Sequence, residues 1–225
     1  MKDTIIRNLT EIRGRIAEAC EEYDRDADEI SLLAVTKGFP AAYIKTIVAA
    51  GVYEIGESRV QEAEAKILEV GRIARFHMIG HLQTNKARRA VQLFDVIQSV
   101  DSFKLAAEIN SRASQADRVM ECFVEVNTSG EPQKYGVSPD ETLPLLERLL
   151  PMPHLKVTGL MTIGPLTNDE EAVRAAFRRC RELFEAGKRL VGDDFEHLSM
   201  GMTHDFPLAI AEGSTMVRIG TGLFG

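Results

Sequence analysis

This chain of 225 residues has few cysteines, no excess of positive charge and no long apolar runs. Its three cysteines, Cys20, Cys122 and Cys180, are widely spaced and form no paired motif, which indicates free thiols in a reducing compartment. The formal net charge of −7 provides no broad basic surface for nucleic acid or anionic lipid. No run approaches the roughly 18 apolar residues of a membrane span, and the N-terminus is charged rather than signal-like. We therefore expect a cytoplasmic protein without nucleic-acid or membrane partners.

The rest of the composition is that of an ordinary globular protein. Hydrophobic residues make up 44% and charged residues 27% of the chain. No low-complexity tract or Pro/Gly/Ser-rich linker divides it. We expect one domain over residues 1–225.

Apolar segments and amphipathic segments alternate along the whole sequence. After an N-terminal helix over 4–23, the expected strands are 32–37, 52–56, 75–79, 96–100, 119–126, 157–163, 197–200 and 216–219. The expected helices between them are 41–50, 59–70, 84–93, 102–116, 140–150, 169–191 and 205–212. Repeated βα units imply parallel strands. The pattern predicts an α/β protein with a closed (β/α)8 TIM barrel, in which the extra N-terminal helix covers the gap after the last strand. An open doubly wound sheet is the alternative.

Lys37 follows the apolar residues 32–35 and Thr36, at the expected end of the first strand. Either the stem of this lysine packs while its ammonium reaches solvent, or the amine is held inside a site. In a barrel, active sites lie at the carboxyl ends of the strands. Polar residues gather after the other strands too, and they include Glu57, Ser58, His81, Asp101, Asn127, Thr128, Thr162, Ser199 and Thr221. A role as a helix cap or loop residue is the simpler explanation for Asp101 and Asn127.

The last two strands indicate a phosphate site. Ser199 and Gly201 follow the seventh strand, and Gly220 and Thr221 follow the eighth, where small residues let backbone amides approach a ligand. Arg218 alternates with apolar neighbours in the eighth strand, which places a guanidinium in the interior. Its partner is either a structural carboxylate or a ligand.

A lysine, a phosphate site and a polar group between them suggest pyridoxal 5′-phosphate (PLP), whose aldehyde forms a Schiff base with a lysine amine. An arginine facing the ring nitrogen could not accept its proton, so the ring would be a weaker electron sink. Alternatively, Lys37 binds a phosphorylated substrate directly. His77 and His81 lie four residues apart but lack a third ligand at a suitable spacing, so we expect no metal site.

Six segments resemble the YggS/PROSC family of pyridoxal phosphate homeostasis proteins. They are Ala34–Lys37, Gly56–Glu62, the His-Met-Ile-Gly-His-Leu-Gln-Thr-Asn-Lys run at 77–86, Gly159–Ile163, Ser199–Met202 and Arg218–Thr221. The resemblance implies the fold type III barrel of the alanine racemase N-terminal domain. It also implies a Schiff base between PLP and Lys37.

The same resemblance implies roles for further residues. Ser199, Gly201, Gly220 and Thr221 would hold the phosphate, Arg218 would face the pyridine nitrogen, and Asn127 and Met161 would line the pocket. Ser58 replaces the family's usual asparagine, which weakens any transfer of that contact. Thr203 and His204 also depart from the commonest pattern, and we expect them to contact neither the lysine nor the phosphate loops.

Three functions fit these features. The first is a protein for intracellular PLP homeostasis with little or no catalytic turnover and no catalytic residue, for which PLP-dependent apoenzymes are candidate partners. Racemases of this fold carry a second domain that supplies a catalytic tyrosine and a dimer contact, and the sequence ends at Gly225 without such a segment. We therefore expect a monomer. The second function is a PLP-dependent racemase or lyase, and the third is a phosphate-substrate enzyme without a Schiff base.

Overall fold

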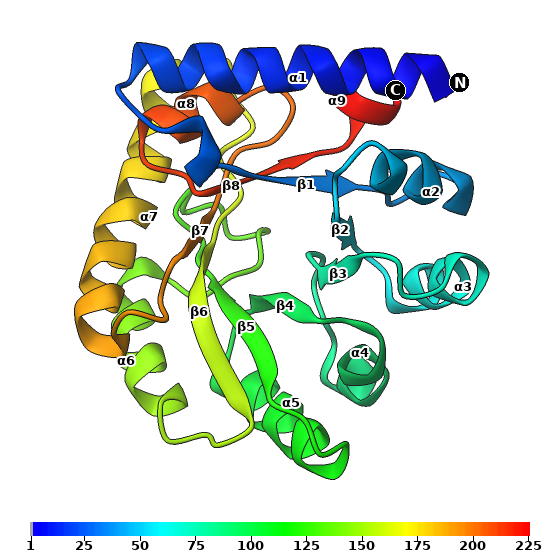
Figure 1. The fold of residues 1–225 in the computed structure, drawn as a ribbon. Helices are drawn as coiled ribbons and strands as arrows, with labels where there is room; N and C mark the ends of the chain where they lie inside the picture. The colour runs from blue at the N-terminus through cyan, green and yellow to red at the C-terminus, as the bar shows by residue number, and fades with distance from the viewer. Residues whose placement is uncertain (1) are drawn as a thin grey trace.

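A computed structural model describes residues 2–225, and its eight strands form one closed parallel barrel in sequence order (Figure 1). The strands are β1 (Ser31–Val35), β2 (Glu54–Glu57), β3 (Arg75–Met78), β4 (Val96–Val100), β5 (Met120–Glu125), β6 (Leu155–Met161), β7 (His197–Ser199) and β8 (Met216–Ile219). Pairing of β1 with β8 closes the barrel, with Leu33 opposite Arg218. The predicted (β/α)8 barrel is confirmed, and the open-sheet alternative is excluded.

Helices occupy the outside of the barrel and connect its strands. They are α1 (Lys2–Glu22), α2 (Ala41–Ala49), α3 (Val60–Val70), α4 (Ala87–Leu93), α5 (Phe103–Gln115), α6 (Pro139–Leu149), α7 (Glu170–Val191), α8 (Phe206–Ala211) and α9 (Thr221–Phe224), with short 3₁₀ turns at Ala27–Glu29 and Thr84–Lys86. Most bounds fall within two residues of the prediction. The expected helix over 84–93 is divided between a 3₁₀ turn and α4, and α9 was not predicted because four residues carry no periodicity.

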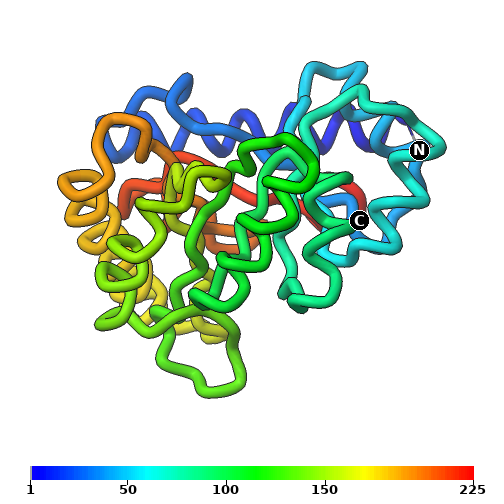
Figure 2. The backbone as a smooth tube through the Cα atoms, turned by 90° about the horizontal axis from the view of Figure 1, so that it is seen from below, coloured from blue at the N-terminus to red at the C-terminus, as the bar shows by residue number. Residues whose placement is uncertain are grey.

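The N-terminal helix α1 packs against the elements that flank the end of the barrel. Its buried stripe consists of Ile5, Leu9, Ile12, Ile16, Ala19 and Cys20. Figure 1 shows α1 lying along α8 and α9, and both Figure 1 and Figure 2 place the two termini on one side of the molecule. The Asn8 side chain donates a hydrogen bond of 3.1 Å to the Leu223 carbonyl. As predicted, α1 covers the region after β8.

Apolar side chains fill the middle of the barrel and define which residues face its interior. Leu33, Val35, Val96, Phe123, Met161 and Met216 form one buried cluster there. Because side chains alternate along a strand, the interior series continues from Leu33 and Val35 to Lys37, and from Met216 to Arg218 and Gly220. Lys37 and the residues after β8 therefore share the carboxyl end of the barrel.

No helix within residues 2–225 combines the length and the apolar character needed to cross a bilayer. The three cysteines are free thiols and all are buried.

Candidate functional site

Lys37 lies in a tight turn just beyond β1 rather than in the strand itself. The Thr36 amide still donates to the Gly56 carbonyl of β2 at 3.0 Å. The Phe39 amide then donates to the Thr36 carbonyl, which closes a turn with Gly38 at φ 76°. Lys37 is exposed in this turn. The turn therefore places Lys37 at the carboxyl end of the barrel, beyond the apolar cluster, with its side chain exposed to solvent.

Arg218 is a buried cation on the interior side of β8, with only 4% of its surface exposed. Its guanidinium donates to the Ser199 hydroxyl and to the Thr162 carbonyl, both at 2.8 Å. Burial lowers the pKa of Arg218 to about 10, although Asp205 and Glu125 oppose this effect, and the group is still charged at neutral pH. Neither of these two hydrogen bonds is to a carboxylate. The structural ion pair considered from the sequence is therefore not what holds this side chain.

A chain of hydrogen bonds runs from Arg218 down through the barrel interior. The Ser199 hydroxyl donates to Gln98 at 2.8 Å, and Gln98 Nε2 lies 2.9 Å from His77 Nδ1. His77 Nε2 in turn bonds Glu54 at the opposite end of the barrel. Ser199, Gln98 and His77 are all fully buried. Burial raises the pKa of Glu54, but the hydrogen bond and charge of His77 outweigh it, so the net shift is downward.

The loops after β7 and β8 meet, and Thr203 joins them. The Thr203 hydroxyl lies 3.3 Å from the Thr221 hydroxyl and accepts a hydrogen bond of 3.2 Å from the Gly222 amide. The expectation that Thr203 contacts no phosphate loop is therefore wrong. A hydroxyl residue directly after the Gly201–Met202 segment was the available signal in the sequence.

The glycines predicted for the phosphate site lie beside these threonines. Gly201 has φ 92°, and a Cβ there would approach Ala209 Cβ to 2.6 Å, so close packing of the loop on α8 requires glycine. A Cβ on Gly220 would lie 3.3 Å from the Val35 carbonyl. Gly220 therefore allows the loop after β8 to run close to the end of β1, next to the Lys37 turn.

Asn127 and Met161 lie at different depths in the carboxyl end of the barrel. Met161 is fully buried in the interior cluster and forms part of the floor. The Asn127 amide donates to the carbonyls of Glu131 and Lys134, at 2.9 and 3.3 Å, and its Oδ1 accepts from the Ser129 hydroxyl. The Asn127 side chain thus organises the loop after β5.

Glu125 is a buried carboxyl that sequence reasoning missed. It ends β5, which in the strand order lies across the barrel from β1 and the Lys37 turn. Only 5% of Glu125 is exposed, and its Oε2 has no hydrogen-bond partner among residues 2–225. Burial, helped by the charge of Asp101 and opposed by Arg218, raises its pKa to about 7. The signal in the sequence was a charged residue inside the expected apolar strand over 119–126.

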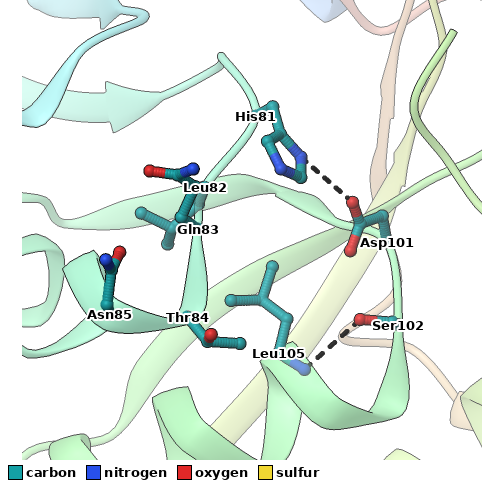
Figure 3. A pocket seen from close by; sticks show the side chains of 8 residues that line it. All are labelled: His81, Leu82, Gln83, Thr84, Asn85, Asp101, Ser102 and Leu105. Carbon is teal, nitrogen blue, oxygen red and sulfur yellow. Dashed lines mark hydrogen bonds and ion pairs between the residues drawn. The ribbon is translucent and has the colours of Figure 1, made fainter. Parts of the chain in front are cut away.

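A separate pocket of about 390 Å³ lies on the rim after β3 and β4 (Figure 3). His81 and Asp101 contact each other in its lining, with Nδ1 and Oδ2 3.2 Å apart, and the Ser102 hydroxyl accepts from the Leu105 amide at the start of α5. The His81 ring also stacks on Tyr135, with 3.8 Å between centroids. Ser58 lies beside Gly80 on this rim, where a Cβ on the glycine would meet the Ser58 carbonyl at 2.4 Å.

The two histidines of the 77–86 run have separate partners. His77 is inside the barrel and His81 is exposed on the rim. Within residues 2–225, no three His, Cys, Asp or Glu side chains gather in a way that could hold a metal ion.

Comparisons with known proteins agree on one family. Residues 9–225 match the family described as the alanine racemase N-terminal domain. A pyridoxal phosphate homeostasis protein of Aquifex aeolicus is 41% identical over 218 residues, covering 96% of both chains. PipY of Synechococcus elongatus, solved with PLP bound, is 34% identical with a TM-score of 0.84, covering 98% of this chain and all of PipY (100%).

An alanine racemase of Clostridium difficile is 16% identical with a TM-score of 0.81, and the match covers 99% of this chain but 59% of the racemase. This match shows the shared barrel. The similarity to the homeostasis proteins identifies the family more specifically, because it is 41% identity over nearly the full length of both chains. The chain therefore belongs to the pyridoxal phosphate homeostasis protein family, whose barrel is that of the alanine racemase N-terminal domain.

Proposed function

We propose that this protein binds PLP as a Schiff base on Lys37 and serves intracellular PLP homeostasis with little or no catalytic turnover. One observation carries the proposal: Lys37, Arg218 and the loops after β7 and β8 lie at one end of the barrel, in a family whose member PipY binds PLP. When bound, PLP supplies an electrophilic carbonyl carbon and an electron-withdrawing ring.

The residues at the mouth fit the parts of this cofactor. Lys37 offers an exposed amine, which can react without first breaking an ion pair with another side chain among residues 2–225. The hydroxyls of Thr203 and Thr221, together with the backbone at Gly201 and Gly220, form a compact group of small residues and donors suited to a phosphate. Met161 provides an apolar floor, and Asn127 shapes the wall after β5.

Arg218 would face the ring nitrogen as a donor only. Because it is held by Ser199 and Thr162 and stays charged, it cannot take a proton from that nitrogen. The proposed role of Ser199 is thus to hold Arg218, since its hydroxyl already bonds both Gln98 and Arg218. Such a site binds the cofactor firmly but does little to activate its ring, which suits a carrier.

A PLP-dependent racemase or lyase is the second candidate, and Glu125 is the observation that favours it. A carboxyl with a pKa of about 7 across the mouth from Lys37 could exchange a proton with a bound amino acid. Exchange of the α-hydrogen of amino acids with deuterated solvent separates the two functions. We expect rates close to those with free PLP, whereas a large enhancement that is lost in Glu125→Gln would favour the enzyme.

We propose a cytoplasmic monomer that gives PLP to PLP-dependent apoenzymes, and the three free buried thiols support a reducing compartment. A transfer experiment tests this proposal. The PLP-loaded protein is mixed with a PLP-dependent apoenzyme, and the recovered activity of the apoenzyme is compared with the activity recovered with an equal amount of free PLP. Failure to bind PLP in the first place would refute the proposal.

A further inference from the structure

Lys66 is a buried lysine that lies directly beneath the Lys37 turn. It projects from α3, which packs outside β2 (Figure 1), and it is only 7% exposed. Its ammonium donates to the Glu57 carboxylate and the Glu62 carboxylate, both at 2.7 Å, and to the Thr36 carbonyl at 2.5 Å. Three donors meet three acceptors, so the hydrogen-bonding capacity of Lys66 is fully used.

The two carboxylates extend this cluster to both neighbours of Lys37. Glu57 accepts a hydrogen bond from the Thr36 hydroxyl, and Glu62 accepts one of 2.5 Å from the Gly38 amide. Thr36 is therefore held through its hydroxyl and carbonyl, and Gly38 through its amide. The turn that presents Lys37 is fastened on each side to one cluster, which we define as Glu57, Glu62 and Lys66.

The charges in this cluster do not cancel. One ammonium faces two carboxylates, and Glu57 Oε2 is buried without a partner among residues 2–225. Burial raises the pKa of Glu57, although the hydrogen bonds that it accepts from Lys66 and Thr36 oppose this shift. For Glu62, the hydrogen bonds from Lys66 and Gly38 outweigh burial, and its pKa is lowered. Lys37 lies in sequence between Thr36 and Gly38, whose hydroxyl and amide bond these two carboxylates. Arg59 is a further cation near Glu62.

We propose that Lys66 is the positioning residue for Lys37: it fixes the turn around Lys37 and, by occupying Glu57 and Glu62, keeps these carboxylates from binding the Lys37 amine. This role of Lys66 does not depend on a bound cofactor. The consequence for cofactor loading rests on the proposed function, because a free amine, and not an ion-paired ammonium, attacks a carbonyl.

The test measures Lys37 reactivity without PLP. The full-length protein is treated with formaldehyde and cyanoborohydride, and methylation of Lys37 over time is followed by peptide mass spectrometry. In Lys66→Met we expect methylation of Lys37 to be about tenfold slower, the effect of one charge-assisted hydrogen bond. Lys45→Met is the matched control, because among residues 2–225 the Lys45 side chain forms only an exposed ion pair with Glu69 at 3.9 Å.

A second variant separates charge competition from general damage to the fold. Replacing all three cluster residues, as Glu57→Gln, Glu62→Gln and Lys66→Met together, removes the competing carboxylates and should restore the rate of Lys37 methylation. If Lys66→Met does not fold, Glu62→Gln alone should still speed hydrogen exchange of the Gly38 amide, since it weakens the acceptor of that bond. Circular dichroism reports the fold in each case.

The outcomes have distinct meanings. A folded Lys66→Met that methylates Lys37 at the wild-type rate would overturn the proposal, as would a triple variant that stays slow or unchanged Gly38 exchange in Glu62→Gln. Slow methylation in Lys66→Met with rescue in the triple variant would support it. Because no arm uses PLP, a wild-type protein that fails to bind PLP would refute the proposed function without touching this inference.

Discussion

The isosteric change Glu125→Gln offers a quantitative test of the polar barrel mouth. Burial, reinforced by Asp101 and opposed by Arg218, raises the pKa of Glu125 from 4.5 to about 7. Such a shift corresponds to about 3 kcal/mol in the free energy of unfolding. Because the folded state binds this proton more tightly, the stabilisation is complete below pH 4.5 and is lost as the pH rises to about 7.

Glutamine keeps the shape of Glu125 but cannot ionise. We therefore expect Glu125→Gln to gain stability relative to wild type as the pH rises, by up to about 3 kcal/mol above neutrality. Urea unfolding at a series of pH values, with ionic strength held constant and no PLP present, measures this difference. The exposed residue Glu11 provides the control, since Glu11→Gln should follow the wild-type curve. Parallel curves for wild type and Glu125→Gln would refute the assignment of a buried, unpaired carboxyl.

Three further substitutions test other parts of the site. Thr203→Val removes the hydroxyl that accepts from Gly222, and we expect about tenfold weaker PLP binding by absorbance titration, with no change in the exposed control Thr10→Val. Gly201→Ala should lower the free energy of unfolding by about 2 kcal/mol, because its Cβ would lie 2.6 Å from Ala209 Cβ; an unchanged urea midpoint would contradict this close packing. Gln98→Leu leaves Ser199 and His77 without their shared partner, so we expect a loss of about 2 kcal/mol by the same assay, and weaker PLP binding as Arg218 loses its support.

The barrel itself could be predicted because its signals are local. Each strand is a short apolar run and each helix has an apolar stripe, so eight repeats identify the architecture before any contact is known. The glycine-rich ends of β7 and β8 and the lysine after β1 were recognisable for the same reason. Their common location follows from the rule that parallel strands end on one side of the barrel.

The details that depend on contacts between elements could not be predicted. The exposure of Lys37 is set by a turn whose Gly38 amide bonds Glu62 on α3, 24 residues away in sequence. The interior path from Arg218 to Glu54 needs the register of several strands, including the irregularity in β4 beside Gln98. Single polar residues inside apolar strands were the only trace of this path in the sequence.

The central claim is that Lys37 holds PLP, and site mapping tests it most directly. The protein is incubated with PLP, reduced with borohydride and digested, and each lysine is quantified by peptide mass spectrometry. We predict one dominant reduced adduct on Lys37, its loss in a Lys37→Ala variant that keeps the native fold, and no loss in the control Lys45→Ala. An adduct spread evenly over surface lysines, or an unchanged yield in Lys37→Ala, would contradict the claim.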